Sequence, residues 1–177
     1  GGDEENPPYA EPMLVNITYI ANNDGGFVIF RDNAAGSYVN SIFTDGAEGI
    51  RIEYRDDKHS SYDWVEELPT GDAILGIANS AFSRMADETV ATQIFAKAES
   101  GDLPQGHDVL MASLFNLGEN KIEEVDIDGD NPVPASAPTI TVRTLDDLYG
   151  FFTQVNYIGA FEPGGNNWAE GWTLMYQ

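Results

Sequence analysis

Short β-branched segments alternate with turns rich in Asn, Asp and Gly in the first third of the chain, and this rhythm constrains the fold most. The segments are 13–21, 27–31, 37–43 and 50–55. The turn Asn22-Asn23-Asp24-Gly25-Gly26 uses residues that tolerate positive φ, so it predicts a hairpin between the first two segments. Short strands with turns roughly every ten residues are typical of antiparallel sandwiches and barrels. We therefore predict a mainly β domain, an antiparallel β-sandwich or meander, with an α+β arrangement as the alternative.

The rest of the chain is assigned from the same signals. The polar segment 56–72 is predicted to be a loop with a helical turn. Further strands are expected, two of them paired across Gly118-Glu119-Asn120. The expected strands are 73–78, 109–117, 121–127 (paired with 109–117), 139–143 and 172–176.

Segment 83–100 is the predicted helix that packs on the sheet. Apolar residues recur there every four positions, and Gly101 suits a C-terminal stop. Alternation from Val90 to Ala96 leaves a strand as the alternative. A second, short helix is expected at 144–149, with Thr144 as its cap. We find no internal repeat, which argues against a β-helix in this chain.

The chain is predicted to fold as one domain, 13–177, preceded by an acidic, Pro-rich extended arm, 1–12. The opening GGDEENPP resembles a mature terminus left after processing, and a lipid anchor upstream of Gly1 stays open. At the other end, segment 151–177 is rich in aromatic residues and Gly. Aromatic side chains bury large areas, so we expect this segment to be a clasp that closes the fold or an anchor on a neighbouring subunit.

The last 35 or so residues also carry a resemblance. Phe151-Phe152, Val155, Tyr157-Ile158-Gly159-Ala160-Phe161, Asn167-Trp168 and Gly171-Trp172-Thr173 resemble the tail of secreted bacterial surface proteins. Such proteins occur in Bacteroidetes-like and marine bacteria and often contain right-handed β-helices. The resemblance implies export and a β-rich body, and it carries no catalytic residues to this chain.

The net charge of −22, from 30 acidic and 8 basic residues, narrows the partners. Nucleic-acid affinity depends on Lys and Arg that neutralise phosphates, so nucleic acid is excluded, and anionic membranes are disfavoured. Acidity favours cation binding, life outside the cell, or a halophilic source that requires no functional site. The absence of Cys removes disulfides and thiolate metal sites.

Alternating carboxylates in the segment 126–131 indicate a candidate Ca²⁺ site. Hard cations take several oxygen ligands, which a tight acidic loop supplies. The ligands are Asp126, Asp128, Asp130 and Asn131. The segment lacks the Gly and the final Glu of a complete EF-hand loop, so a solvated acidic turn is the alternative. No other cofactor is required.

Catalytic signatures are weak. His59, Ser60, Ser61 and Asp63 contain the residue types of a nucleophilic triad, but they lie too close in sequence to be assumed assembled. No nucleophile elbow, phosphate loop or dinucleotide fingerprint occurs. We therefore predict that the protein is not an enzyme.

Aromatic residues form the remaining candidate site, as a platform for sugar rings or as an interface or core. They are Tyr62, Trp64, Phe151, Phe152, Tyr157, Phe161, Trp168 and Trp172. The leading prediction is a secreted or cell-surface structural subunit, filament-like or layer-like, that contacts other copies or another surface protein through its arm and tail. The alternative is a secreted module that binds Ca²⁺ or carbohydrate.

Overall fold

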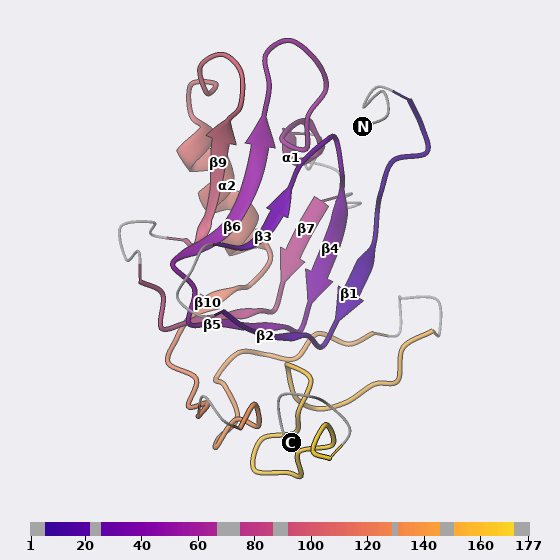
Figure 1. Cartoon of the computed structure of the whole chain (residues 1–177), viewed down its shortest axis with the longest axis vertical. Coiled ribbons are helices and arrows are strands. Elements are labelled where there is room, and N and C mark those ends of the chain that lie inside the picture. The colour runs from indigo at the N-terminus through magenta and orange to yellow at the C-terminus, as the bar shows by residue number, and fades with distance from the viewer. Residues whose placement is uncertain are drawn as a thin grey trace.

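The computed structural model describes residues 6–21, 26–66, 75–86, 92–128, 131–145 and 151–171. The chain winds in three coils, and each coil adds one strand to each of three sheets (Figure 1). The first coil contains β1 (Met13–Val15), β2 (Thr18–Ile20) and β3 (Gly26–Phe30). The second contains β4 (Gly36–Val39), β5 (Ile42–Thr44) and β6 (Glu48–Tyr54), and the third contains β7 (Leu75–Ala78), β8 (Ala81–Ser83) and β9 (Ile94–Ala98).

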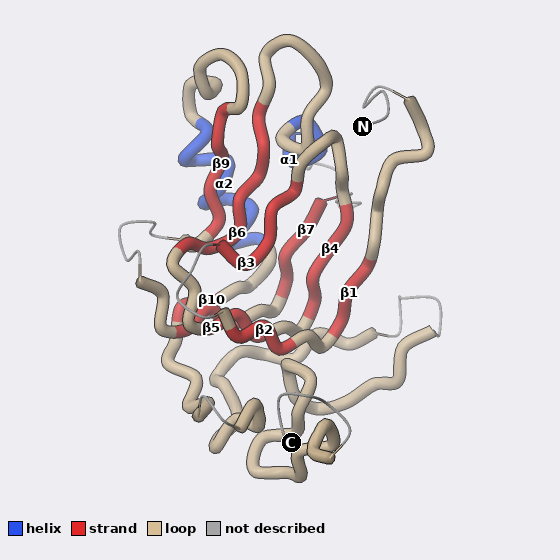
Figure 2. The backbone as a smooth tube through the Cα atoms, viewed as in Figure 1, coloured by secondary structure: helices blue, strands red, loops and turns tan. Residues whose placement is uncertain are grey.

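Every strand pairing between these elements is parallel. The sheet orders are β1-β4-β7, β10-β8-β5-β2 and β3-β6-β9, where β10 (Lys121–Ile122) extends the second sheet. The two helices found in the described residues, α1 (Asp63–Glu66) and α2 (His107–Leu117), lie outside the sheets (Figure 2). This winding is that of a short parallel β-helix.

The predicted antiparallel sandwich or meander is therefore wrong. Segments 13–21 and 27–31 form no hairpin, because β1, β2 and β3 belong to three different sheets. Segment 13–21 breaks at Asn16, whose φ of 54° places it in the left-handed region. Asn tolerates that region, so the chain turns a corner there instead of continuing as one strand. Segment 37–43 breaks in the same way at Asn40.

The corners reveal a repeat, so the prediction that none exists is also wrong. Asn16, Asn40 and Asn79 all have positive φ and occupy the same corner of successive coils. The second and third coils continue with matching letters, Asn40-Ser41-Ile42-Phe43 and Asn79-Ser80-Ala81-Phe82. Equivalent positions are 24 and then 39 residues apart. This unequal spacing hides the repeat from a search for a fixed period.

A ladder of buried polar side chains lines the same corner inside the coils. Ser41 Oγ accepts a hydrogen bond from the backbone N–H of Ile17 at 3.3 Å, and Ser80 Oγ accepts one from Ser41 N–H at 3.1 Å. Asn120 Oδ1 continues the ladder by accepting from Ser80 N–H at 3.0 Å. Backbone donors that the bend removes from the sheets are thus satisfied.

The core lies inside the coils and is built from stacked side chains. Phe43 and Phe82 stack with their ring centroids 5.1 Å apart, and Phe82 contacts Phe115 of α2 at 5.8 Å. Aliphatic side chains from β6, β7 and β9 complete the core. They are the fully buried residues Ile50, Ile52, Leu75, Ile77 and Ile94.

Helix α2 closes the third-coil end. Its buried residues Met111, Leu114 and Phe115 face the core, and α2 packs against β7 and β9. The strand predicted at 109–117 is therefore wrong, because this apolar run covers the end of the coils. The helix predicted at 83–100 is wrong as well, since β8 ends at Ser83 and β9 occupies 94–98. A strand was the alternative for the second part; residues 87–91 lie outside the described residues.

Among the other predicted elements, α1 confirms the helical turn within 56–72, and β6 and β7 coincide with the strands predicted at 50–55 and 73–78. Segment 121–127 contains only the short β10, and segment 139–143 forms no strand. The rest of the predicted helix at 144–149 beyond Leu145, and the strand at 172–176, lie outside the described residues.

Both terminal segments pack on the β-helix where they are described. Ala10 O accepts a hydrogen bond from Ala35 N–H, and Pro12 O accepts one from Ser37 N–H, each at 2.8 Å. The C-terminal segment covers the outer face of the β2-β5-β8 sheet, as the orange and yellow part of Figure 1 shows. Ile42 and Ala81 are fully buried beneath it, with Val125, Ile127, Ile140 and Ile158 as their cover.

Candidate functional site

Two surfaces of the molecule are candidate sites. The first is the open end of the β-helix, which we call the first-coil end. It consists of strands β1, β2 and β3 with their side chains Leu14, Tyr19 and Val28. Tyr19 is 40% exposed, whereas Phe43 and Phe82, which follow it in register, are fully buried. Leu14 and Val28 are half-buried, while Ile77 and Ile50 in their ladders are buried. Tyr38, which lies next to Leu14 in its ladder, is half-buried as well, so the loss of burial from the second coil to the first is seen for Tyr19 and Val28.

The two ends of the β-helix differ. At the first-coil end, β1, β2 and β3 are the edge strands of their sheets among the described strands. Met13 and Ile29, on two of these strands, are 41% and 44% exposed. At the opposite end, α2 and β10 cover the third coil. Open strand edges with exposed apolar side chains favour pairing with another chain.

The second surface lies on the C-terminal segment, which the corner asparagines hold in place. Asn16 Nδ2 donates to Tyr157 O at 2.9 Å and to Gly159 O at 3.1 Å. Asn79 Nδ2 donates to Thr141 O at 3.0 Å. The left-handed bend turns the side chains of Asn16 and Asn79 outward. They thus bind the backbone of the C-terminal segment, which lies far away in sequence.

Arg84 adds a charged anchor for the same segment. Its guanidinium donates to Asp45 at 2.7 Å through two nitrogens, and to the carbonyl oxygens of Val125 and Ile127 at 2.9 Å. The hydrogen bonds from Arg84 lower the pKa of Asp45 below its ordinary value. Charge-assisted, bidentate bonds of this kind are stronger than neutral ones.

The anchored segment forms a groove beside Asn16, which we call the tail groove. Two adjoining depressions that share Val155 and Tyr157 make it up. Their described lining is Val15, Asn16, Val142, Thr144, Leu145, Phe152, Thr153, Gln154, Val155, Asn156, Tyr157, Gly159, Ala160 and Trp168. None of these lining residues is charged, although acidic residues are abundant in the chain as a whole.

Trp168 forms one wall of the tail groove in a fixed orientation. Its indole stacks on Phe161 with the ring centroids 5.0 Å apart and the planes 18° from parallel. Its Nε1–H donates to Ala160 O at 2.8 Å. Phe161 is buried, but Trp168 remains 55% exposed. Phe152 and Tyr157 are half-buried in the groove, and Phe151, which packs edge-on against Phe152, is 84% exposed.

The other predicted aromatic site residues lie elsewhere. Tyr62 is only 1% exposed and belongs to the core, where it contacts Tyr54. Trp64 is half-buried, donates through Nε1 to Asn33 O, and packs edge-on against Tyr9. Trp172 lies outside the described residues. The structure thus brings together Phe151, Phe152, Tyr157, Phe161 and Trp168, and separates Tyr62 and Trp64 into the core and the arm contact.

The predicted acidic loop is a turn in its described part. Asp128 and Asn131 form an antiparallel bridge, and Asn131 Oδ1 accepts from the Val133 N–H at 3.2 Å. The side-chain oxygen of Asn131 therefore serves the turn itself. Asp126 and Asp128 are exposed, and Asp130 lies outside the described residues. Across the described ranges, no group of three or more His, Asp and Glu is placed to hold a metal ion.

The residues resembling a triad meet without forming one. Ser60 N–H donates to Asp63 Oδ2 at 2.7 Å, and Ser60 Oγ lies 3.4 Å from the same oxygen. His59 Nδ1 also lies 3.4 Å from Asp63 Oδ2, so the imidazole contacts the carboxylate and not the serine. A nucleophilic relay needs the serine on the histidine. Asp63, the first residue of α1, holds the loop before the helix.

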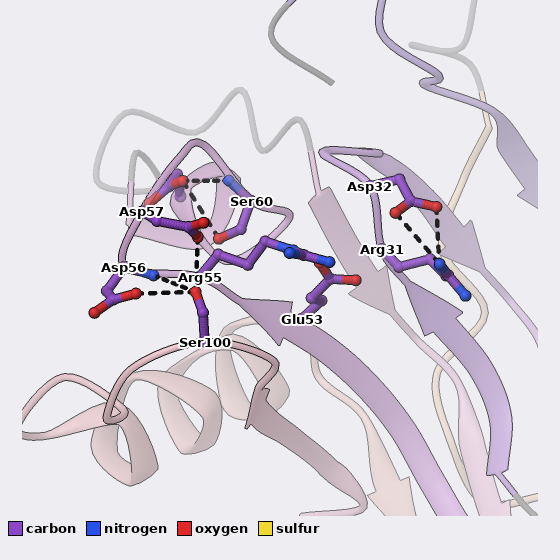
Figure 3. A network of polar contacts seen from close by, with 9 residues as sticks. Arg31, Asp32, Glu53, Arg55, Asp56, Asp57, Ser60 and Ser100 are labelled. Atoms are coloured by element: carbon purple, nitrogen blue, oxygen red, sulfur yellow. Dashed lines mark hydrogen bonds and ion pairs between the residues drawn. The ribbon is translucent and has the colours of Figure 1, made fainter. Parts of the chain in front are cut away.

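A neighbouring polar network closes the ends of β6 and β9 (Figure 3). Ser100 Oγ lies 2.9 Å from Asp56 Oδ1 and 2.7 Å from Asp57 Oδ1, and it accepts from Asp56 N–H at 3.2 Å. The hydrogen bond to Ser100 lowers the pKa of Asp57. Glu53 pairs with Arg55 in the same view. These contacts join the loops that follow β6 and β9.

Comparison with known proteins does not place the chain in a family. No protein-family model, curated protein or solved structure matches it significantly. Within the described residues, no helix is long and apolar enough to cross a bilayer.

The first-coil end was not predicted. Its residues are ordinary core types in sequence, and nothing about Leu14, Tyr19 or Val28 alone indicates exposure. The matching residues after Asn40 and Asn79 were the available signal, because they align the second coil with the third.

Proposed function

We propose that this protein is a non-enzymatic structural subunit that acts outside the cell and associates with a second copy through the first-coil end. The carrying observation is that Tyr19 and Val28 are less buried than Phe43 and Ile50, which follow them in their ladders. Tyr19 is the clearest case, at 40% exposed against 0% for Phe43. The acidic composition and the absence of Cys are compatible with an extracellular setting.

A second copy fits this end better than an unrelated surface does. Edge strands β1, β2 and β3 surround one cross-section, so only another coil of the same cross-section meets all three edges at once. Head-to-tail stacking is blocked, because α2 covers the third-coil end. A two-fold axis brings first-coil end against first-coil end, and such isologous contacts stop at a dimer. The association is therefore a closed pair rather than the filament suggested by sequence.

In this proposal the described parts of the arm and tail do not make the contact between copies. Residues 6–12 and the anchored C-terminal segment pack on their own β-helix, through the hydrogen bonds of Ala10, Pro12, Asn16 and Asn40. They stabilise the subunit, and the contact between copies is assigned to the coil end instead.

Light scattering after size-exclusion chromatography, from about 1 to 100 μM protein, tests the proposal. We expect a monomer–dimer equilibrium that shifts toward dimer with added salt, because each copy carries a net charge of −22. Tyr19→Asp should weaken the dimer by more than about tenfold. Phe151→Asp is the matched control, since it places the same charge on an exposed aromatic of the tail.

A dimer broken by Phe151→Asp but not by Tyr19→Asp would assign the contact to the tail. A monomer at every concentration and salt level would reject the proposal.

A further inference from the structure

We infer that the tail groove is a binding site for a neutral saccharide, with Trp168 as its stacking platform. The groove shares only Val15 of β1 with the first-coil end, and the inference does not rest on dimer formation. It rests on the fixed orientation of one indole, the uncharged described lining and the polar groups of Asn16 and Thr153.

The indole of Trp168 is presented in a rigid way. Stacking on the buried Phe161 and the 2.8 Å hydrogen bond from Nε1 to Ala160 O fix both its plane and its rotation. The ring nevertheless keeps 55% of its surface exposed. A pyranose ring has a face of C–H groups, which carry partial positive charge and are attracted to the negative face of an aromatic ring. Little entropy is lost when a pre-oriented platform binds.

Polar groups beside the platform suit the hydroxyls of a sugar. Asn16 donates through Nδ2 to the tail backbone, and within the described part of the chain its Oδ1 accepts no hydrogen bond. The Thr153 hydroxyl lines the same depression as Trp168, and the amide of Asn156 lines the adjoining one. The amide of Gln154 is already engaged, since its Oε1 accepts from Leu145 N–H at 2.7 Å and its Nε2 donates to Val155 O at 2.6 Å. An apolar wall with a few convergent polar groups is the usual make-up of a small-molecule site.

Charge decides the class of saccharide. The described lining contains no Lys or Arg to pair with carboxylate or sulfate groups, and the chain carries a net charge of −22. Anionic polysaccharides are therefore repelled. The described lining contains no carboxylate either, so it gives an amino sugar no direct ion pair. A neutral oligosaccharide is the remaining ligand class.

The test is a titration of the full chain with neutral hexasaccharides of glucose, mannose and galactose, followed by calorimetry. Oligogalacturonate of the same length serves as the anionic arm. We expect at least one neutral hexasaccharide to bind with a millimolar or lower Kd, and oligogalacturonate to bind at least about tenfold more weakly. Trp168→Ala should weaken binding by about tenfold.

Three variants separate binding from folding. Trp168→Phe keeps a ring on Phe161 and should retain part of the affinity, and Thr153→Val removes one hydroxyl without changing the side-chain volume. Phe82→Leu, in the core, is the control for a general loss of stability and should leave the Kd unchanged. If no hexasaccharide binds at a concentration of about 10 mM, any Kd is too weak for a specific site, and the inference is overturned. Preference for the anionic ligand, or a Kd unaffected by both Trp168→Ala and Thr153→Val, would overturn it too.

Discussion

Asn40 and Arg143 lie 103 residues apart and are joined by two hydrogen bonds. Asn40 Nδ2 donates to Arg143 O at 3.0 Å, and Arg143 N–H donates to Asn40 Oδ1 at 2.8 Å. One side-chain amide thus pairs with the backbone N–H and C=O of one residue, in the way that a residue of a neighbouring strand would. The residue that turns the second coil also holds the C-terminal segment.

Replacement of Asn40 should therefore cost stability twice. Asn40→Ala removes both hydrogen bonds, at roughly 1 kcal/mol each, and strains the backbone at a φ of 51° by about 1–2 kcal/mol. Asn40→Gly removes the bonds without the strain, so its loss should be smaller. Urea unfolding measures both. Equal losses of unfolding free energy for the two variants would show that the left-handed bend has no cost. Asn156→Ala, at an exposed asparagine, is the control and should change the unfolding free energy little.

Asp45 should make stability depend on acid. Its pKa is lowered in the folded state, chiefly by the hydrogen bonds from Arg84, so its ionised form stabilises the fold. That stabilisation is present above the unfolded pKa of about 4 and is lost as the pH falls through the folded pKa. Asp45→Asn should lower stability at neutral pH and flatten its fall below about pH 4.

Melting temperatures measured from pH 7 down to about pH 2.5, which is below the ordinary pKa of Asp, report this effect. Asp32→Asn is the control, because its ion pair with Arg31 is exposed and contributes little. An Asp45→Asn variant with the same acid dependence as the wild type would contradict the assignment.

Gly159 should tolerate no side chain, because the C-terminal segment lies directly on the β2-β5-β8 sheet there. A Cβ at this position would lie 2.6 Å from Ile42 Cδ1 and 2.7 Å from Thr18 Oγ1. Gly171 is the matched control, since its φ of 85° is close to the 82° of Gly159 but a Cβ there meets nothing within 4 Å. Backbone strain destabilises both Ala variants, and Gly159→Ala should lose about 1–3 kcal/mol more unfolding free energy than Gly171→Ala. Equal melting temperatures would show that the segment is not held against the sheet.

The interior stack should dominate the stability of the coils. Phe82 is fully buried between Phe43 and Phe115, so Phe82→Ala should cost about 3–5 kcal/mol through lost contacts and a residual cavity. Phe151→Ala removes the same ring from an 84% exposed position and should stay within about 0.5 kcal/mol of the wild type. Denaturant midpoints compare the two. A small loss for Phe82→Ala would mean that the coils pack loosely around the stack.

The strands at 50–55 and 73–78 were predictable because apolar alternation reports which side of a segment is buried. Alternation does not report the neighbour or its direction. Ile50 lies beside Val28 and Ile94 in parallel sheets, and those partners are 22 and 44 residues away, as their numbers show. The hairpin predicted between segments 13–21 and 27–31 failed for this reason, because β2 and β3 pair in different sheets.

The candidate site divides in the same way. The aromatic character of segment 151–171 was visible, as was the capacity of Asn to adopt positive φ. That Trp168 stacks on Phe161, while Tyr62 is buried in the core, follows only from packing. No local signal could separate these rings, since aromatic residues serve cores and surfaces alike.

By itself the sequence determined the charge of the molecule, the absence of thiol chemistry and the positions where the backbone bends, because each is a property of single residues or of neighbours in the chain. The tertiary structure decided that the bends stack into a parallel β-helix, that α2 covers one end, and that Tyr19 is left at the other. Those outcomes depend on pairing between residues 24 to 103 positions apart. Such long-range pairing is selected by the burial of whole ladders of side chains, which no short window of sequence contains.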